Sequence, residues 1–111
     1  MTLPLEVFQQ GFMQDAAPET AAVVHSVLRG QPYRTLTDEP VGGSQYRELG
    51  IPMEYVLSSE DIALPPGDFA WAPRFPDRCG ATPTIVPGSH ESVFTRPAEL
   101  AQGLLRACGR S

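Results

Sequence analysis

The chain has 111 residues, of which 41% are hydrophobic and 19% charged, and its formal net charge is −5. This length allows one modest hydrophobic core. No apolar run reaches the ~18 residues that a membrane span needs, and no basic segment leads into an apolar one. We therefore expect a soluble, cytoplasmic protein with no membrane partner. All eight basic residues are arginines scattered along the chain, which disfavours a nucleic-acid partner.

Cysteines and clustered metal ligands are scarce. Cys79 and Cys108 lie in a chain without an export signal, so we expect two reduced thiols rather than a disulfide. Two cysteines with distant histidines do not make a zinc-binding pattern. The sequence therefore predicts neither a metal nor a cofactor.

The first part of the chain predicts two helices and then an irregular segment. Residues 4–14 carry apolar side chains at helical spacing, although Gly11 weakens this helix. A second helix is predicted from Pro18, which suits a first turn, to Gly30, which can supply a left-handed stop. Prolines and glycines interrupt residues 31–52, so no long element is expected there.

The rest of the chain predicts strands alternating with helices. Residues 53–59 have a near-continuous apolar centre, typical of a parallel strand buried on both faces, and residues 82–86 predict a second strand. Between them, Pro65 and Pro66 allow a short helix to begin, and later prolines keep it short. Residues 96–108 predict a closing helix. Its expected apolar stripe consists of Leu100, Ala101, Leu104, Leu105 and Cys108.

This order of elements predicts an α/β fold. Two strands joined through a helix form a parallel unit, with the closing helix packed on it. A sheet of two or three such strands leaves its outer edges unpaired. We therefore expect a partner, or a second copy of the chain, to complete the sheet.

Polar residues follow both predicted strands. Glu60 and Asp61 come after the first, and Ser89 to Ser92, with His90 among them, come after the second. Ligands of open α/β sheets gather at the carboxyl ends of the strands, and adjacent parallel strands would bring Asp61 and His90 side by side. A carboxylate that accepts a hydrogen bond from one imidazole nitrogen leaves the other nitrogen as a base. The alternative is an aspartate that caps the next segment and a histidine that satisfies a turn.

The order and spacing of these residues resemble a known family. The stretches IPMEYVLSSEDIALPP and TIVPGSHESVFTRPAELAQGLL resemble the C-terminal part of α/β-hydrolases, in particular the branch of plant-type esterases and hydroxynitrile lyases with their bacterial relatives. The resemblance matches Asp61 to the acid of the catalytic triad, His90 to its base, and residues 97–100 to the start of the final helix. The stretch FMQDAAPETAAVVHSVLRGQPYRTLTDEP resembles the late cap region of these proteins.

The resemblance implies two segments: a cap-like helical and irregular segment over residues 1–52, and a C-terminal hydrolase-like unit over residues 53–111. The nucleophile elbow of the family, G-x-S-x-G, has no counterpart in this sequence. The nearest string, GGSQY, contains Ser44 but has no apolar strand before it and no helix after it. Ser89 and Ser92 flank His90, and hydrogen bonding within the loop is the favoured interpretation of both.

Other residues that could carry chemistry have simpler interpretations. His25 is interpreted as a helix-surface or core-edge histidine, and Glu60 as a solvated neighbour of Asp61, with substitute triad acid as its alternative. Trp71 and Phe69 are expected to pack the short helix onto the sheet, with a pocket wall as the alternative. The cap-like segment also contains two tyrosines that either line a pocket or simply pack, Tyr33 and Tyr46.

Two functional hypotheses follow. In the first, Asp61 and His90 serve as an acid–base pair for hydrolysis of an ester, lactone or related carbonyl compound, or for proton abstraction, elimination or cyclisation. The nucleophile for hydrolysis would come from another polypeptide, and the chain would pair with itself or with an N-terminal hydrolase half. In the second, the chain is a non-catalytic, hydrolase-derived binding module. A third interpretation is that the sequence is a fragment of a longer esterase.

Overall fold

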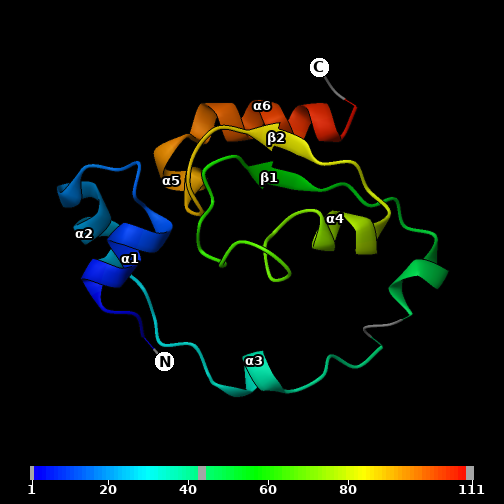
Figure 1. The fold of residues 1–111 in the computed structure, drawn as a ribbon, viewed down its shortest axis with the longest axis horizontal. Coiled ribbons are helices and arrows are strands. Elements are labelled where there is room, and N and C mark those ends of the chain that lie inside the picture. The colour runs from blue at the N-terminus through cyan, green and yellow to red at the C-terminus, as the bar shows by residue number, and fades with distance from the viewer. Residues whose placement is uncertain (1, 43–44, 110–111) are drawn as a thin grey trace.

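The computed structural model describes residues 2–42 and 45–109, which form a two-stranded parallel sheet flanked by helices (Figure 1). The predicted α/β class is confirmed. The helices are α1 (Leu5–Phe12), α2 (Pro18–Ser26), α3 (Arg34–Thr37), the 3-10 helix η1 (Tyr46–Leu49), α4 (Arg74–Cys79), α5 (Ser92–Thr95) and α6 (Pro97–Ala107), and the strands are β1 (Val56–Ser58) and β2 (Thr84–Val86). Within the described residues, no helix is long and apolar enough to cross a membrane.

The two strands run parallel and in register. Val56 pairs with Thr84, and Ser58 pairs with Val86. Backbone hydrogen bonds continue past the strands, because the Glu60 amide donates to the Gly88 carbonyl at 3.0 Å. The loops that follow β1 and β2 therefore leave the sheet at the same edge, as parallel pairing requires.

Helix α6 packs on the sheet through a glycine. A Cβ atom added at Gly103 would lie 2.2 Å from Cγ1 of Val86, and the Val86 side chain is only 1% exposed. The predicted apolar stripe is therefore only partly correct. Leu104 and Leu105 are about half exposed, because the described residues place no element over them, whereas Gly103 allows close approach to β2.

The first two helices have a small core of their own. The buried residues of this cluster are Phe8, Met13, Ala21 and Val24. Helix α2 ends at Ser26, so the predicted extension to Gly30 is wrong. Every residue from Ser26 to Gly42 is exposed, so a longer helix would have gained no packing.

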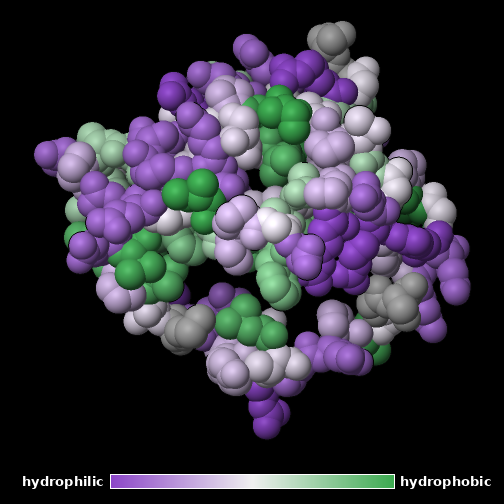
Figure 2. All heavy atoms as spheres, viewed as in Figure 1, coloured by the Kyte–Doolittle hydropathy of each residue, from purple (hydrophilic) through white to green (hydrophobic). Residues whose placement is uncertain are grey.

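A long connection leads from α2 to β1. Its described residues carry only the short helices α3 and η1, and it runs as an arc along one side of the molecule (Figure 1). Open space separates parts of this arc from the body of the protein when all side chains are drawn (Figure 2). The prediction of an irregular segment is confirmed here, whereas the proposed boundary between residues 52 and 53 remains a prediction.

The helix between the strands lies later than predicted. It does not begin at Pro65 and Pro66 but after Pro73, as α4. The chain turns at Gly67, whose φ of +94° is a conformation that side chains rarely adopt, and this turn interrupts the segment in which the helix was expected. The short helix α5, directly after the His90 loop, was not predicted.

Candidate active site

Asp61 and His90 form a hydrogen-bonded pair at the carboxyl edge of the sheet. Asp61 follows β1 by three residues and His90 follows β2 by four. Nδ1 of His90 lies 2.8 Å from Oδ2 of Asp61, and their side chains are 31% and 10% exposed, respectively. The proximity expected from the sequence is therefore observed, while the catalytic roles of both residues remain predictions.

The second oxygen of Asp61 holds the carboxylate in place. Oδ1 accepts a hydrogen bond from the Ala63 amide at 3.0 Å. Because an ionised carboxylate only accepts hydrogen bonds, the proton in the Asp61–His90 contact belongs to Nδ1 of the imidazole. The lone pair of the neutral ring then lies on Nε2, for which the described residues provide no hydrogen-bond partner.

Two aromatic rings surround the imidazole of His90. Trp71 stacks on it with ring centroids 5.4 Å apart and an interplanar angle of 21°, and Phe12 meets it nearly perpendicularly at 5.1 Å. Trp71 also contacts Phe75 of α4. The short helix that Trp71 was predicted to pack onto the sheet does not form at residues 65–72, so the observed contacts of Trp71 are with α4 and with His90. The packing role predicted for Phe69 is wrong, because this side chain is 63% exposed.

Ser92 and Ser89, on either side of His90, make hydrogen bonds to other segments of the chain. Oγ of Ser92 accepts from Oγ of Ser58 at 3.0 Å. Ser89 is fully buried, and its backbone amide donates to Oδ2 of Asp15 at 3.2 Å. The loop hydrogen bonding expected of both serines is therefore not what the structure has: Ser92 begins α5 and bonds to β1, while the Oγ of Ser89 is buried without a hydrogen-bond partner among the described residues. Ser44, the third candidate serine, lies outside the described residues.

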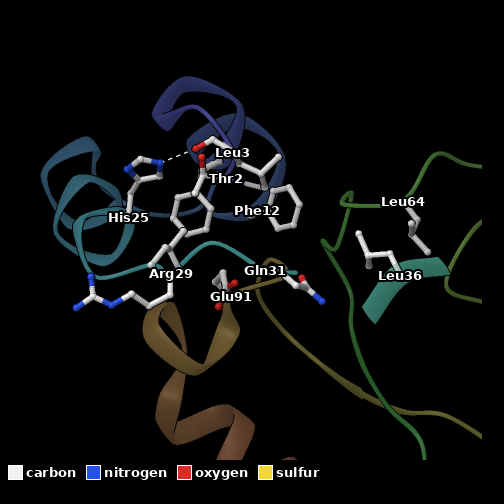
Figure 3. A pocket seen from close by; sticks show the side chains of 11 residues that line it. Thr2, Leu3, Phe12, His25, Arg29, Gln31, Leu36, Leu64 and Glu91 are labelled. Atoms are coloured by element: carbon white, nitrogen blue, oxygen red, sulfur yellow. Dashed lines mark hydrogen bonds between the residues drawn. The ribbon is translucent and has the colours of Figure 1, made fainter. Parts of the chain in front are cut away.

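A cavity of about 610 Å³ opens between the first two helices and the start of the long connection (Figure 3). Its lining residues are Thr2, Leu3, Phe8, Phe12, His25, Leu28, Arg29, Gln31, Leu36, Leu64 and Glu91. Two of these lining residues are next to His90: the ring of Phe12 contacts the imidazole, and Glu91 follows His90 in the sequence. A second cavity, of about 370 Å³, is lined by Asp61 and Trp71 among others. Of the pair, Asp61 lines the second cavity directly, whereas neither Asp61 nor His90 lines the first.

His25 has the structural role that the sequence predicts. Its Nε2 makes a 2.7 Å hydrogen bond with the Leu3 carbonyl, drawn as a dashed line in Figure 3. Its ring also packs against the ring of Phe8. Tyr46 donates from its hydroxyl to the Arg78 carbonyl at 3.2 Å, whereas Tyr33 is exposed.

Sequence reasoning missed two residues near the pair, Asp15 and Tyr55. Tyr55 donates to the Trp71 carbonyl at 3.3 Å, and burial raises the pKa of its hydroxyl, with smaller contributions from Cys79 and Asp61. Its position in the first predicted strand was the available signal. Asp15 is held by residues far away in the sequence, so no local pattern marked it. Groups of three or more metal-ligating side chains are absent from residues 2–42 and 45–109.

The fold, a two-stranded parallel sheet with flanking helices, matches a fragment of an α/β-hydrolase. A solved structure superposes with a TM-score of 0.84 and 26% sequence identity, covering 96% of this chain. It is described as an extracellular α/β-hydrolase from a Paenibacillus species with structural and functional homology to tobacco salicylic acid binding protein 2. This chain spans 45% of that protein's length. Neither a protein-family model nor a curated protein matches the sequence.

Proposed function

We propose that this chain supplies the acid–base pair of a hydrolase-type active site, with His90 as the base and Asp61 as the residue that orients it. The substrate class is an ester, a lactone or a related carbonyl compound. The 2.8 Å contact between Nδ1 of His90 and Oδ2 of Asp61, at the carboxyl edge of a parallel sheet, carries the proposal.

The proposed chemistry uses the free nitrogen of His90. Nε2 takes the proton of a hydroxyl as its oxygen attacks the carbonyl carbon, and the imidazolium later returns this proton to the leaving alcohol. Asp61 stabilises the positive charge that His90 carries between these steps. In elimination or cyclisation, the same nitrogen would take a proton from the substrate itself.

The nucleophile and the rest of the sheet are proposed to come from outside the sequence given. The described chain forms a two-stranded sheet and spans 45% of the matched hydrolase. Ile85 on β2, Val93 on α5 and Leu104 on α6 are all about half exposed, which supports coverage by a second surface. A second copy of the chain or an N-terminal hydrolase half would meet this need. Light scattering on the purified chain tests self-pairing, and a folded monomer would exclude it.

The decisive assay combines the chain with the N-terminal part of the matched Paenibacillus hydrolase and follows cleavage of a chromogenic ester. We expect activity only in the mixture, because removing a triad nucleophile costs on the order of 10⁶-fold in turnover. His90→Ala should abolish this activity, and Asp61→Asn should lower it on the order of 10³- to 10⁴-fold. His25→Gln, which removes the other imidazole, is the matched control and should retain activity.

Two results would contradict this assignment. One is ester cleavage that survives His90→Ala unchanged. The other is a fluorophosphonate adduct on Ser44, Ser89 or Ser92 of the chain alone, since that would place the nucleophile within this sequence.

The second candidate function is a non-catalytic binding module. The cavity of about 610 Å³ favours it, because apolar side chains dominate its wall. This hypothesis predicts that His90→Ala leaves ligand or partner binding unchanged, whereas filling the cavity with Leu28→Trp weakens it.

A further inference from the structure

We infer that Asp15 is a positioning residue for His90, one that holds the backbone of the His90 loop against the N-terminal helices; this inference rests on the proposed role of His90 as a base. Oδ2 of Asp15 accepts two hydrogen bonds, from the Ser89 amide at 3.2 Å and from Oγ1 of Thr95 at 3.0 Å. These donors lie 74 and 80 residues away in the sequence. One carboxylate oxygen therefore connects the segment after α1 to the residue before His90 and to the last residue of α5.

The residues on either side of His90 are held by the same short segment of chain. The Ser89 amide donates to Asp15, and the Glu91 amide donates to the Phe12 carbonyl at 3.1 Å. Phe12 also contacts the imidazole ring with its own ring. Asp61 thus fixes the ring of His90 from the β1 side, while residues 12–15 fix its backbone from the α1 side.

The electrostatic environment keeps Asp15 ionised. Burial raises the pKa of its carboxyl, but the hydrogen bonds from Ser89 and Thr95 outweigh this effect and lower the pKa overall. Nε of Arg96 lies 3.9 Å from the same oxygen. Hydrogen bonds to an ionised acceptor are shorter and stronger than neutral ones, so the charge of Asp15 strengthens the attachment of the loop.

The geometry explains why this attachment matters for a base. Ser89 is fully buried and directly precedes His90, so a shift of its backbone would move the imidazole relative to the fixed carboxylate of Asp61. A displacement of about 1 Å at such a site is enough to cost on the order of 10²-fold in rate. Asp15 therefore acts through Ser89 and not on the substrate.

The test uses the full chain and two spectroscopic readouts that need no substrate. Amide hydrogen exchange reports the Ser89 hydrogen bond, and the ¹⁵N spectrum of the imidazole reports whether Nδ1 of His90 carries the proton donated to Asp61. In Asp15→Ala we expect exchange at Ser89 to accelerate at least about tenfold and the Nδ1–H signal to broaden or disappear. The Thr84 amide, which donates to the Tyr55 carbonyl in the sheet, is the internal control and should not change.

Conservative variants separate positioning from folding. Asp15→Asn keeps an acceptor oxygen in place and should restore most of the Ser89 protection, whereas Asp15→Glu keeps the charge but displaces it and should not. Thr95→Val removes one donor but leaves the Ser89 bond, so exchange at Ser89 should accelerate less than in Asp15→Ala. If Asp15→Ala fails to fold, the difference in Ser89 exchange between Asp15→Asn and Asp15→Glu still tests the positioning role.

The outcomes separate this inference from the proposed function. In the complemented ester assay, Asp15→Ala should lower kcat with little change in KM, and Asp15→Asn should rescue it. Unchanged Ser89 exchange and an unchanged Nδ1–H signal in Asp15→Ala would overturn the positioning role, whatever the activity. Loss of both signals, together with activity that survives His90→Ala, would instead refute the proposed function and confirm the attachment.

Discussion

Gly103 sets the distance between α6 and β2, and a single methyl group there should disturb the fold. A Cβ at this position would lie 2.2 Å from Cγ1 and 3.6 Å from Cβ of Val86. Such contacts cannot be relieved easily, because Val86 is buried in the sheet and valine is stiff at its first side-chain torsion. We therefore choose Gly103→Ala as the most direct test of the observed packing.

The expected magnitude follows from two opposing effects. Alanine in a helix interior is favoured over glycine by about 1 kcal/mol, and overpacking a buried contact costs about 1–3 kcal/mol. At 2.2 Å the clash is severe, so we expect Gly103→Ala to lower the free energy of unfolding by a net ~1–2 kcal/mol.

Gly11 provides a matched control in the same protein. It also lies within a helix, α1, but a Cβ there meets nothing within 4 Å. Gly11→Ala should therefore raise the free energy of unfolding by about 0.5–1 kcal/mol. Urea denaturation followed by circular dichroism measures both variants.

A double mutant tests whether the destabilisation by Gly103→Ala comes from the contact with Val86. Val86→Ala removes the clashing methyl groups, so Gly103→Ala in that background should cost at least about 1 kcal/mol less than in the wild type. Equal and stabilising effects of Gly103→Ala and Gly11→Ala would refute the packing of α6 on β2 described above.

Two titrations give further predictions. The pKa of Asp15 is lowered in the folded chain, so its contribution to stability should be present above the unfolded pKa and be lost as the pH falls through the lowered folded value. The thermal stability of Asp15→Asn should therefore fall less than that of the wild type over this acidic range. Parallel curves of stability against pH for the two proteins would disprove this. The pKa of Tyr55 is raised, chiefly by burial, so Tyr55→Phe should remove the latest-titrating tyrosine from an ultraviolet absorbance titration. If Tyr55→Phe instead removes absorbance change from the ordinary tyrosine range and leaves the latest phase in place, the Tyr55 hydroxyl is not buried in solution.

Local patterns in the sequence were enough to find the pair at the centre of the site. Apolar runs before Asp61 and His90 predicted two parallel strands, and parallel strands end at one edge of a sheet. Two residues 29 positions apart could therefore be placed together without a structure, and the observed hydrogen bond agrees. The position of the helix between the strands was harder to predict, because either Pro65 or Pro73 can begin a helix.

The surroundings of the pair were outside the reach of sequence patterns. Asp15 lies in a loop without periodicity, and its hydrogen-bond partners are 74 and 80 residues away. In the sequence, nothing distinguishes Trp71 from other apolar residues, whereas in the structure its ring stacks on His90. Contacts of this kind depend on how whole elements pack, which neighbouring residues in the sequence do not encode.

The sequence by itself determined the class of fold and the two residues beyond its strand ends, because strand formation and parallel pairing follow from local apolar patterns. Only the tertiary structure decided where α2 ends, where α4 begins and ends, which face of α6 meets the sheet, and what holds His90. The physical reason is that a helix end, a close glycine contact and a long-range hydrogen bond each depend on atoms from distant parts of the chain, as Gly103 and Asp15 illustrate.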